Sequence, residues 1–154
     1  MKAFHWMLIV ALPTLAAAQA QPHHGTSGKS ALIGAWQLVR IDVPGSDGKV
    51  IPAAQPKGML IYTIDGHMSV QLMYPESAGT PDNEYVLAGY EASFGSYDLD
   101  ETNHLVSHHV QGSITRDLLV GKDLPRSYRL TSDGHLIIRS ADPREHWSVT
   151  WEHY

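Results

Sequence analysis

The chain has 154 residues, of which 43% are hydrophobic and 18% charged, and this size and composition suit one globular domain. The formal net charge is −5, with no run of like charges and no basic patch, which argues against nucleic acid as a partner. Because cysteine is absent, a disulfide framework, a zinc site built on thiolates and a cysteine nucleophile are excluded.

The first 20 residues have the three regions of an export signal. Lys2 supplies the positive start, residues 4–15 are apolar but too short for a membrane span, and Ala18-Gln19-Ala20 has the small-x-small pattern of a cleavage site. We therefore expect residues 1–20 to be a signal peptide that is cleaved after Ala20, and the mature protein to be periplasmic or secreted. Residues 21–30 are polar and rich in turn formers, and should form a flexible leader.

Residues 56–74 form two extended runs joined by a glycine turn, which predicts a β-hairpin. A two-residue turn at Asp65-Gly66 would leave Tyr62 on a face with polar residues of the second run. A three-residue turn at residues 64–66 would instead pair Tyr62 with Met68 and direct both inward. We favour the second register because it gives glycine the position that needs positive φ, and because it sorts the polar residues of the second run outward.

The other extended runs follow in chain order, separated by segments rich in turn-forming residues. We expect strands at residues 32–43, 94–100, 105–111, 126–130, 135–139 and 146–152. A turn of helix can precede the first of these runs. Residues 132–134 predict a second three-residue turn that ends in glycine. Residues 82–92 have apolar side chains at helical spacing behind Asp82 as a cap, and predict one short helix. Residues 114–120 form either an extended lid or a strand edge, and the sequence does not distinguish the two.

About eight strands, with a turn roughly every 8–12 residues and one short helix, predict an all-β fold, an antiparallel sandwich or barrel. We favour an up-and-down β-barrel because so many consecutive hairpins leave no obvious protected edge. A barrel of about eight strands has room for its own side chains and one small ligand.

Alternation along the strands predicts which side chains enter the barrel. Most of the inward set is apolar and belongs to the core: Trp36, Leu38, Leu60, Met68, Val70, Leu72, Leu99, Val106, Val110, Leu130, Trp147, Val149 and Trp151. The polar members are Tyr62, Tyr97, His108, Arg126 and Tyr128. Because a buried polar group without a partner is costly, these five should bond to one another or face a wet, liganded cavity. Together with Met68 they are the candidate ligand-binding residues, and no catalytic residue is assigned.

Two of these residues have alternative roles. His108 is a core histidine bonded to a tyrosine or a carbonyl, a ligand contact, or a general acid or base. Arg126 forms a surface ion pair with Asp98 or Glu101, or it binds an anion. His108 and His109 point to opposite faces of one strand, so they do not chelate one metal together. We expect no metal and no cofactor, with heme binding through His108 left open.

Gly34-Ala35-Trp36 is similar to the Gly-x-Trp of the first lipocalin strand. In order and spacing, the segments LIGAWQLV, PKGMLIYTIDGHMSVQLM, FGSYDLDE, VSHHVQGS and TWEHY resemble the bacterial and fungal lipocalin-like domain proteins. The resemblance implies a single-domain barrel with a central cavity, here over residues 31–154, and it does not imply one reaction. The chain departs from the family pattern at Ile64, where proline is frequent, and at His153, where arginine is expected.

The leading hypothesis is an exported lipocalin-like protein that binds a small, largely apolar molecule in its barrel cavity. The competing hypothesis is a non-hydrolytic enzyme of the isomerase or cyclase type, in which His108 and a tyrosine move protons on a small hydrophobic metabolite. Whether the protein is an enzyme is therefore undecided. The expected partner is a small hydrophobic ligand, with no nucleic acid and no membrane span, and the oligomeric state is not predicted. Both hypotheses require an open void beside His108, whereas a filled barrel would leave a structural role.

Overall fold

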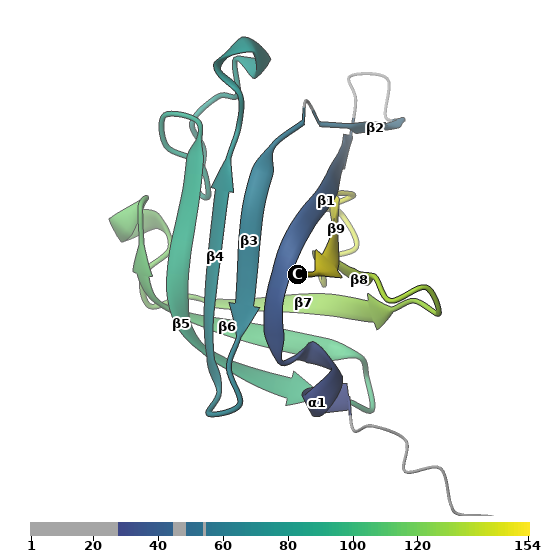
Figure 1. The fold of residues 1–154 in the computed structure, drawn as a ribbon. Coiled ribbons are helices and arrows are strands. Elements are labelled where there is room, and N and C mark those ends of the chain that lie inside the picture. Colours follow the sequence, from purple (N-terminus) through teal and green to yellow (C-terminus); the bar gives the residue numbers. More distant parts are fainter. Residues whose placement is uncertain (1–27, 45–48, 54) are drawn as a thin grey trace, which may run out of the picture.

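The structure, a computed structural model, describes residues 28–44, 49–53 and 55–154. Figure 1 shows these residues as one antiparallel sheet that closes on itself into a barrel. The barrel wall consists of β1 (Gly34–Pro44), β3 (Lys57–Tyr62), β4 (His67–Met73), β5 (Tyr90–Asp100), β6 (Leu105–Ser113), β7 (Asp123–Leu130), β8 (Leu136–Ser140) and β9 (Ser148–His153). The short strand β2 (Val50–Pro52) pairs with the end of β1.

Each wall strand pairs with the next wall strand along the chain, and the pairing of β1 with β9 closes the barrel. The predicted all-β, antiparallel up-and-down barrel of eight strands is therefore confirmed. Closure gives every wall strand a partner on both sides, which removes the edges that an open sheet would expose. The predicted signal peptide, residues 1–20, and residues 21–27 of the predicted leader lie outside the described residues.

Within the described ranges the one α-helix is α1 (Gly28–Leu32), a single turn directly before β1. It includes the last residues of the predicted leader. Leu32 is fully buried, and its carbonyl oxygen accepts a hydrogen bond of 2.9 Å from Nε1 of Trp36. The connections also contain the 3-10 turns η1 (Glu76–Ala78) and η2 (Arg116–Leu118). Residues 114–120, for which the sequence did not distinguish a lid from a strand edge, form a connecting loop between β6 and β7 that contains η2.

The helix predicted for residues 82–92 does not form, and this prediction is wrong. The segment is irregular up to Tyr90, where β5 begins. Asn83 Oδ1 and Asp82 Oδ1 accept hydrogen bonds from backbone N–H groups further along the segment, which closes local turns in place of a helical ladder. Ala88 then adopts φ 51°, a left-handed conformation that a continuing helix does not allow.

The hairpin of β3 and β4 has the register that the three-residue turn predicts. Tyr62 pairs with Met68, and the N–H of Thr63 donates to the carbonyl oxygen of His67 at 2.9 Å. Gly66 has φ 89°, the left-handed conformation for which glycine was expected at this position. Tyr62 and Met68 are both buried, so the turn directs these two side chains into the barrel.

The same turn occurs again between β7 and β8, at residues 131–135. In both turns a threonine hydroxyl accepts the N–H of a histidine four residues later, at 3.0 Å for Thr63 and 2.9 Å for Thr131. Gly134 has φ 87°, so the second predicted glycine turn is also confirmed. Figure 1 shows the turn between β3 and β4 at the end of the barrel that α1 occupies. In an up-and-down barrel alternate turns share one end, so the turn between β7 and β8 belongs to the same end.

This end of the barrel is filled by packed side chains. Trp36 and Tyr62 are each 1% exposed and pack in one hydrophobic cluster with Leu32. The ring of His153 stacks on Trp36 with ring centroids 3.6 Å apart. The histidine at the position where arginine was expected therefore covers this tryptophan. A Cβ on Gly34 would lie 2.8 Å from the His153 ring, which explains why glycine precedes this tryptophan by two residues.

Candidate functional site

A cavity of about 260 Å³ occupies the opposite half of the barrel and opens between the connecting loops. Its wall is mainly aliphatic and aromatic, with a few polar groups. The lining residues are Ile41, Val43, Pro44, Leu60, Val70, Leu72, Tyr74, Asn83, Tyr85, Val86, Glu91, Ser93, His108, Leu124, Arg126, Ile138, Trp147, Val149 and Trp151. An irregularity in the β1–β9 pairing between Leu38 and Arg40 keeps Ile41 on the inner face. The barrel is therefore not filled, which both functional hypotheses required.

Arg126 on β7 is the cation of the cavity, and its side chain is 7% exposed. One terminal nitrogen donates to the hydroxyl of Tyr85 at 3.2 Å, and the other donates to the carbonyl oxygen of Pro125 at 3.3 Å. Both acceptors are neutral. Within the described residues no carboxylate lies within ion-pair distance of this guanidinium, so the expected surface ion pair with Asp98 or Glu101 does not form.

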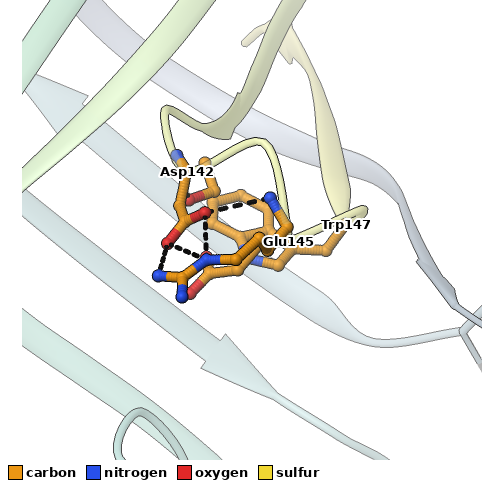
Figure 2. Close-up of polar contacts among 5 residues, drawn as sticks. Asp142, Glu145 and Trp147 are labelled. Atoms are coloured by element: carbon orange, nitrogen blue, oxygen red, sulfur yellow. Dashed lines mark hydrogen bonds and ion pairs between the residues drawn. The ribbon is translucent and has the colours of Figure 1, made fainter.

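Trp147 also contacts the guanidinium of Arg126. It lies in the loop between β8 and β9 (Figure 2), where its Nε1 donates to Glu145 at 3.0 Å and Arg144 binds the carboxylate of Asp142. The carbon at the centre of the Arg126 guanidinium is 4.9 Å from the Trp147 ring centroid, within the range of a cation–π interaction. The sequence placed Trp147 in the core with Trp36 and Trp151. In the structure Trp147 is only partly buried, packs against that core and lines the cavity at its mouth.

Glu91 at the start of β5 is the acidic residue of the cavity lining. Burial raises the pKa of its carboxyl to about 7, although the charge of Arg126 acts in the opposite direction. Sequence reasoning missed this residue because it assigned residues 82–92 to a helix. The signal was present: Glu91 and Ser93 continue the alternation of Gly95 and Tyr97 toward the start of the strand, and all four face inward.

His108 on β6 lies where the cavity meets the packed half of the barrel. Its Nε2 is 2.6 Å from the hydroxyl of Tyr62, the kind of contact expected for a core histidine with a tyrosine. Burial, followed by the nearby charge of Arg126, lowers the pKa of His108 to about 3, so the ring is neutral. Burial also raises the pKa of Tyr62 well above its ordinary value, so this pair is a hydrogen bond between two neutral groups.

The structure divides the six predicted site residues into two groups. His108 and Arg126 line the cavity. The other four lie in the packed half: Tyr62, Met68, Tyr97 and Tyr128. Tyr62 packs edge-on against Tyr97 with centroids 4.8 Å apart, and the hydroxyl of Tyr97 donates to the carbonyl oxygen of Thr63 at 2.9 Å. The five polar side chains therefore do not line one cavity.

His109 points to the outer face of β6, opposite to His108, as alternation predicts. Its two ring nitrogens contact Asp123 Oδ1 at 2.6 Å and Asp98 Oδ2 at 3.0 Å. These hydrogen bonds raise the pKa of His109, with Asp123 as the larger cause. The residue links three neighbouring strands on the surface, and it has no contact with the cavity lining.

Taken together, the closed strands and the open, mainly apolar cavity define a small β-barrel that can enclose a molecule. The profile of the lipocalin-like domain family matches residues 33–153, and the chain belongs to that family. A search of curated proteins finds no match. A solved structure of a redesigned β-barrel is similar with 11% sequence identity and a TM-score of 0.45, over 84% of this chain and 97% of that chain. In the part of the chain that the structure describes, no helix has the length and hydropathy to cross a membrane.

Proposed function

We propose that the protein binds one small, largely apolar molecule in the open half of its barrel. The observation that carries the proposal is the cavity of about 260 Å³, whose wall is apolar except for a few convergent polar groups. This is the usual form of a site for a small organic molecule. A cavity of this volume limits the enclosed part of the ligand to a small molecule.

Native mass spectrometry of protein purified from its own host tests the proposal. We expect a mass increment from a co-purifying small molecule in the wild type, and its loss in Val149→Phe, because Val149 lines the cavity and the larger ring occupies it. Val39→Phe is the matched control, since Val39 points outward from β1 and is exposed. An unliganded wild type that also fails to take up any added apolar compound would contradict the proposal.

The proposed place of action is outside the cytoplasm, in the periplasm or the medium. The support is the order of charge, apolar stretch and small-x-small pattern in residues 1–20. Sequencing of the amino terminus of protein from the native host should begin at Gln21. Mature protein that begins at Met1 would contradict export.

The second candidate is a non-hydrolytic enzyme that transfers protons on a bound apolar substrate. The contact between His108 and Tyr62 is the geometry that this hypothesis needed. A histidine whose pKa is about 3 is nevertheless a weak base at neutral pH, whereas Glu91 with a pKa of about 7 has the matched value. Exchange of the α-protons of octan-2-one in D₂O, followed by NMR, tests this candidate. Catalysed exchange that Glu91→Gln abolishes would favour the enzyme over the binding protein.

A further inference from the structure

We infer that the molecule bound in this cavity is a monocarboxylate, whose charged end is held by the guanidinium of Arg126 and the carboxyl group of Glu91 while its apolar part fills the barrel. This inference rests on the proposed function and specifies the class of ligand. It follows from an incomplete set of contacts around Arg126 and from the position of Glu91.

Arg126 has more donors than the protein satisfies. A guanidinium has five N–H groups, and the described residues accept hydrogen bonds from two of its nitrogens, through Tyr85 and Pro125. Among the described residues, Trp151 Nε1 is the one fully buried side-chain nitrogen or oxygen that has no hydrogen-bond partner, so no nitrogen of Arg126 is both fully buried and without a partner. Nε of Arg126 has no hydrogen-bond partner among the described residues and is not one of these fully buried atoms, so it is accessible to a molecule that enters the cavity.

Among the described residues, the guanidinium of Arg126 also has no carboxylate at ion-pair distance, and Glu91 acts on it only from farther away. Burying an unpaired cation in an apolar wall is costly, and the cation–π contact with Trp147 offsets this cost only in part. A single anionic group on the ligand would complete the site. A carboxylate has the planar shape that accepts two parallel N–H groups from one guanidinium, and it has one negative charge for one cation.

Glu91 is the acidic group that faces this cavity, and it makes no ion pair with Arg126 in the described structure. Its pKa of about 7 means that a large fraction of the carboxyl is protonated at neutral pH. A protonated carboxyl donates a hydrogen bond to a carboxylate, and a hydrogen bond of an O–H to a charged oxygen is a strong one. Glu91 thus adds a donor to the ligand's charged end in place of competing with it for Arg126.

The remaining lining fixes which end of the ligand lies where. The guanidinium contacts Tyr85 and Trp147, both of which come from connecting loops at the mouth. Leu60, Ile138 and Trp151 lie deeper, within the hydrophobic cluster. The charged end therefore binds near the mouth, and the apolar part extends toward the packed half of the barrel.

Three probes with the same eight-carbon chain separate the charge from the apolar part: octanoate, octan-1-ol and octylamine, titrated into the full mature chain at pH 6.5 by calorimetry. Octanoate should bind the wild type at least about tenfold more tightly than octan-1-ol, because hydrogen bonds to charged groups are the stronger ones. Octylamine should bind most weakly. Equal affinity for octanoate and octan-1-ol would overturn the inference while leaving the proposed function standing, and no binding of any probe would overturn both.

Variants of two arginines on the same strand locate the effect. Arg126→Met should lose about tenfold or more in octanoate affinity with little change for octan-1-ol, and Arg126→Lys should lie between, since an ammonium keeps the charge without the planar fork. Arg129→Met is the matched control, because Arg129 points outward from β7 and is exposed. If Arg126→Met fails to fold, Arg126→Lys still decides. Unchanged octanoate affinity in a folded Arg126 variant would overturn the inference.

Discussion

The hydroxyl of Tyr62 lies 2.6 Å from Nε2 of His108, and this contact joins β3 to β6 across the barrel interior, between residues 46 positions apart. Both groups are buried, so removing one leaves the other without a partner in an apolar surrounding. Tyr62→Phe should therefore lower the free energy of unfolding by about 1–3 kcal/mol, as measured by urea denaturation. Tyr90→Phe is the control, since Tyr90 is exposed, and it should change stability little. Equal effects of the two substitutions would contradict this role.

The pKa of His108 gives the stability a specific dependence on pH. Its folded-state pKa of about 3 lies below the ordinary value of 6.5, so the unfolded chain takes up the proton first as pH falls. Stability should be full above about pH 6.5 and decline toward pH 3, with this group contributing at most about 1.4 kcal/mol per pH unit. Urea denaturation between pH 4 and 7.5 measures the slope, which His108→Leu should reduce. An unchanged slope in that variant would show that other groups cause it.

His109 should behave in the opposite way. Hydrogen bonds to Asp123 and Asp98 raise its folded-state pKa, so its contribution to stability is present below about pH 6.5 and is lost as pH rises through the raised value. All three side chains are partly or largely exposed, which limits the contribution to less than about 1 kcal/mol and makes it sensitive to salt. Thermal unfolding of His109→Leu at pH 5.5 and pH 8.5 measures it. The same variant should keep the octanoate affinity of the wild type, whereas His108→Leu should weaken it.

Two tryptophans that the sequence placed in one core should differ in their effect on stability. Trp36 is 1% exposed and packs in the hydrophobic cluster, so Trp36→Ala should cost about 3–5 kcal/mol of unfolding free energy. Trp147 is partly buried at the cavity mouth, so Trp147→Ala should cost less and should mainly alter binding near Arg126. A loss below about 1 kcal/mol for Trp36→Ala would show that Trp36 does not pack as described.

The parts of the fold that could be predicted are those whose causes lie close together in the sequence. The register of β3 and β4 follows from five consecutive residues, 63–67, in which a threonine hydroxyl and a left-handed glycine define the turn. Once that register is known, alternation alone orients Tyr62 and Met68. His108 and Arg126 could be assigned to the interior for the same reason, and both line the cavity.

The parts that were missed depend on contacts between distant residues. Spacing in residues 82–92 suits a helix, but the side-chain oxygens of Asp82 and Asn83 bond to the backbone and close turns instead. This one error removed Glu91 from β5 and hence from the candidate site. Tyr85, the partner of Arg126, lies in the same segment, so its place at the cavity mouth could not be deduced from strand alternation.

The dependence of carboxylate binding on pH should identify Glu91. The other ionisable groups that face it keep one protonation state between pH 6 and 8. Tyr74 and Tyr85 have raised pKa values, that of Tyr74 reaching about 12, His108 is neutral with a pKa of about 3, and Arg126 is charged. The acidic groups at the rim that act on Tyr85 are Glu84 and Glu145. Glu91, with a pKa of about 7, is therefore the group of this cavity that should titrate in that range.

Protonated Glu91 donates to a bound carboxylate, while ionised Glu91 repels it. Octanoate affinity should therefore fall as pH rises through about 7, by up to about tenfold per pH unit, and octan-1-ol affinity should stay nearly constant. Glu91→Gln keeps a hydrogen-bond donor without an ionisable proton, so it should flatten the octanoate profile between pH 6 and 8. Glu84→Gln, which changes an exposed carboxylate at the rim, should retain the wild-type profile. Calorimetric titrations at several pH values measure these profiles, and a wild-type profile that persists in Glu91→Gln would assign the pH dependence to another group.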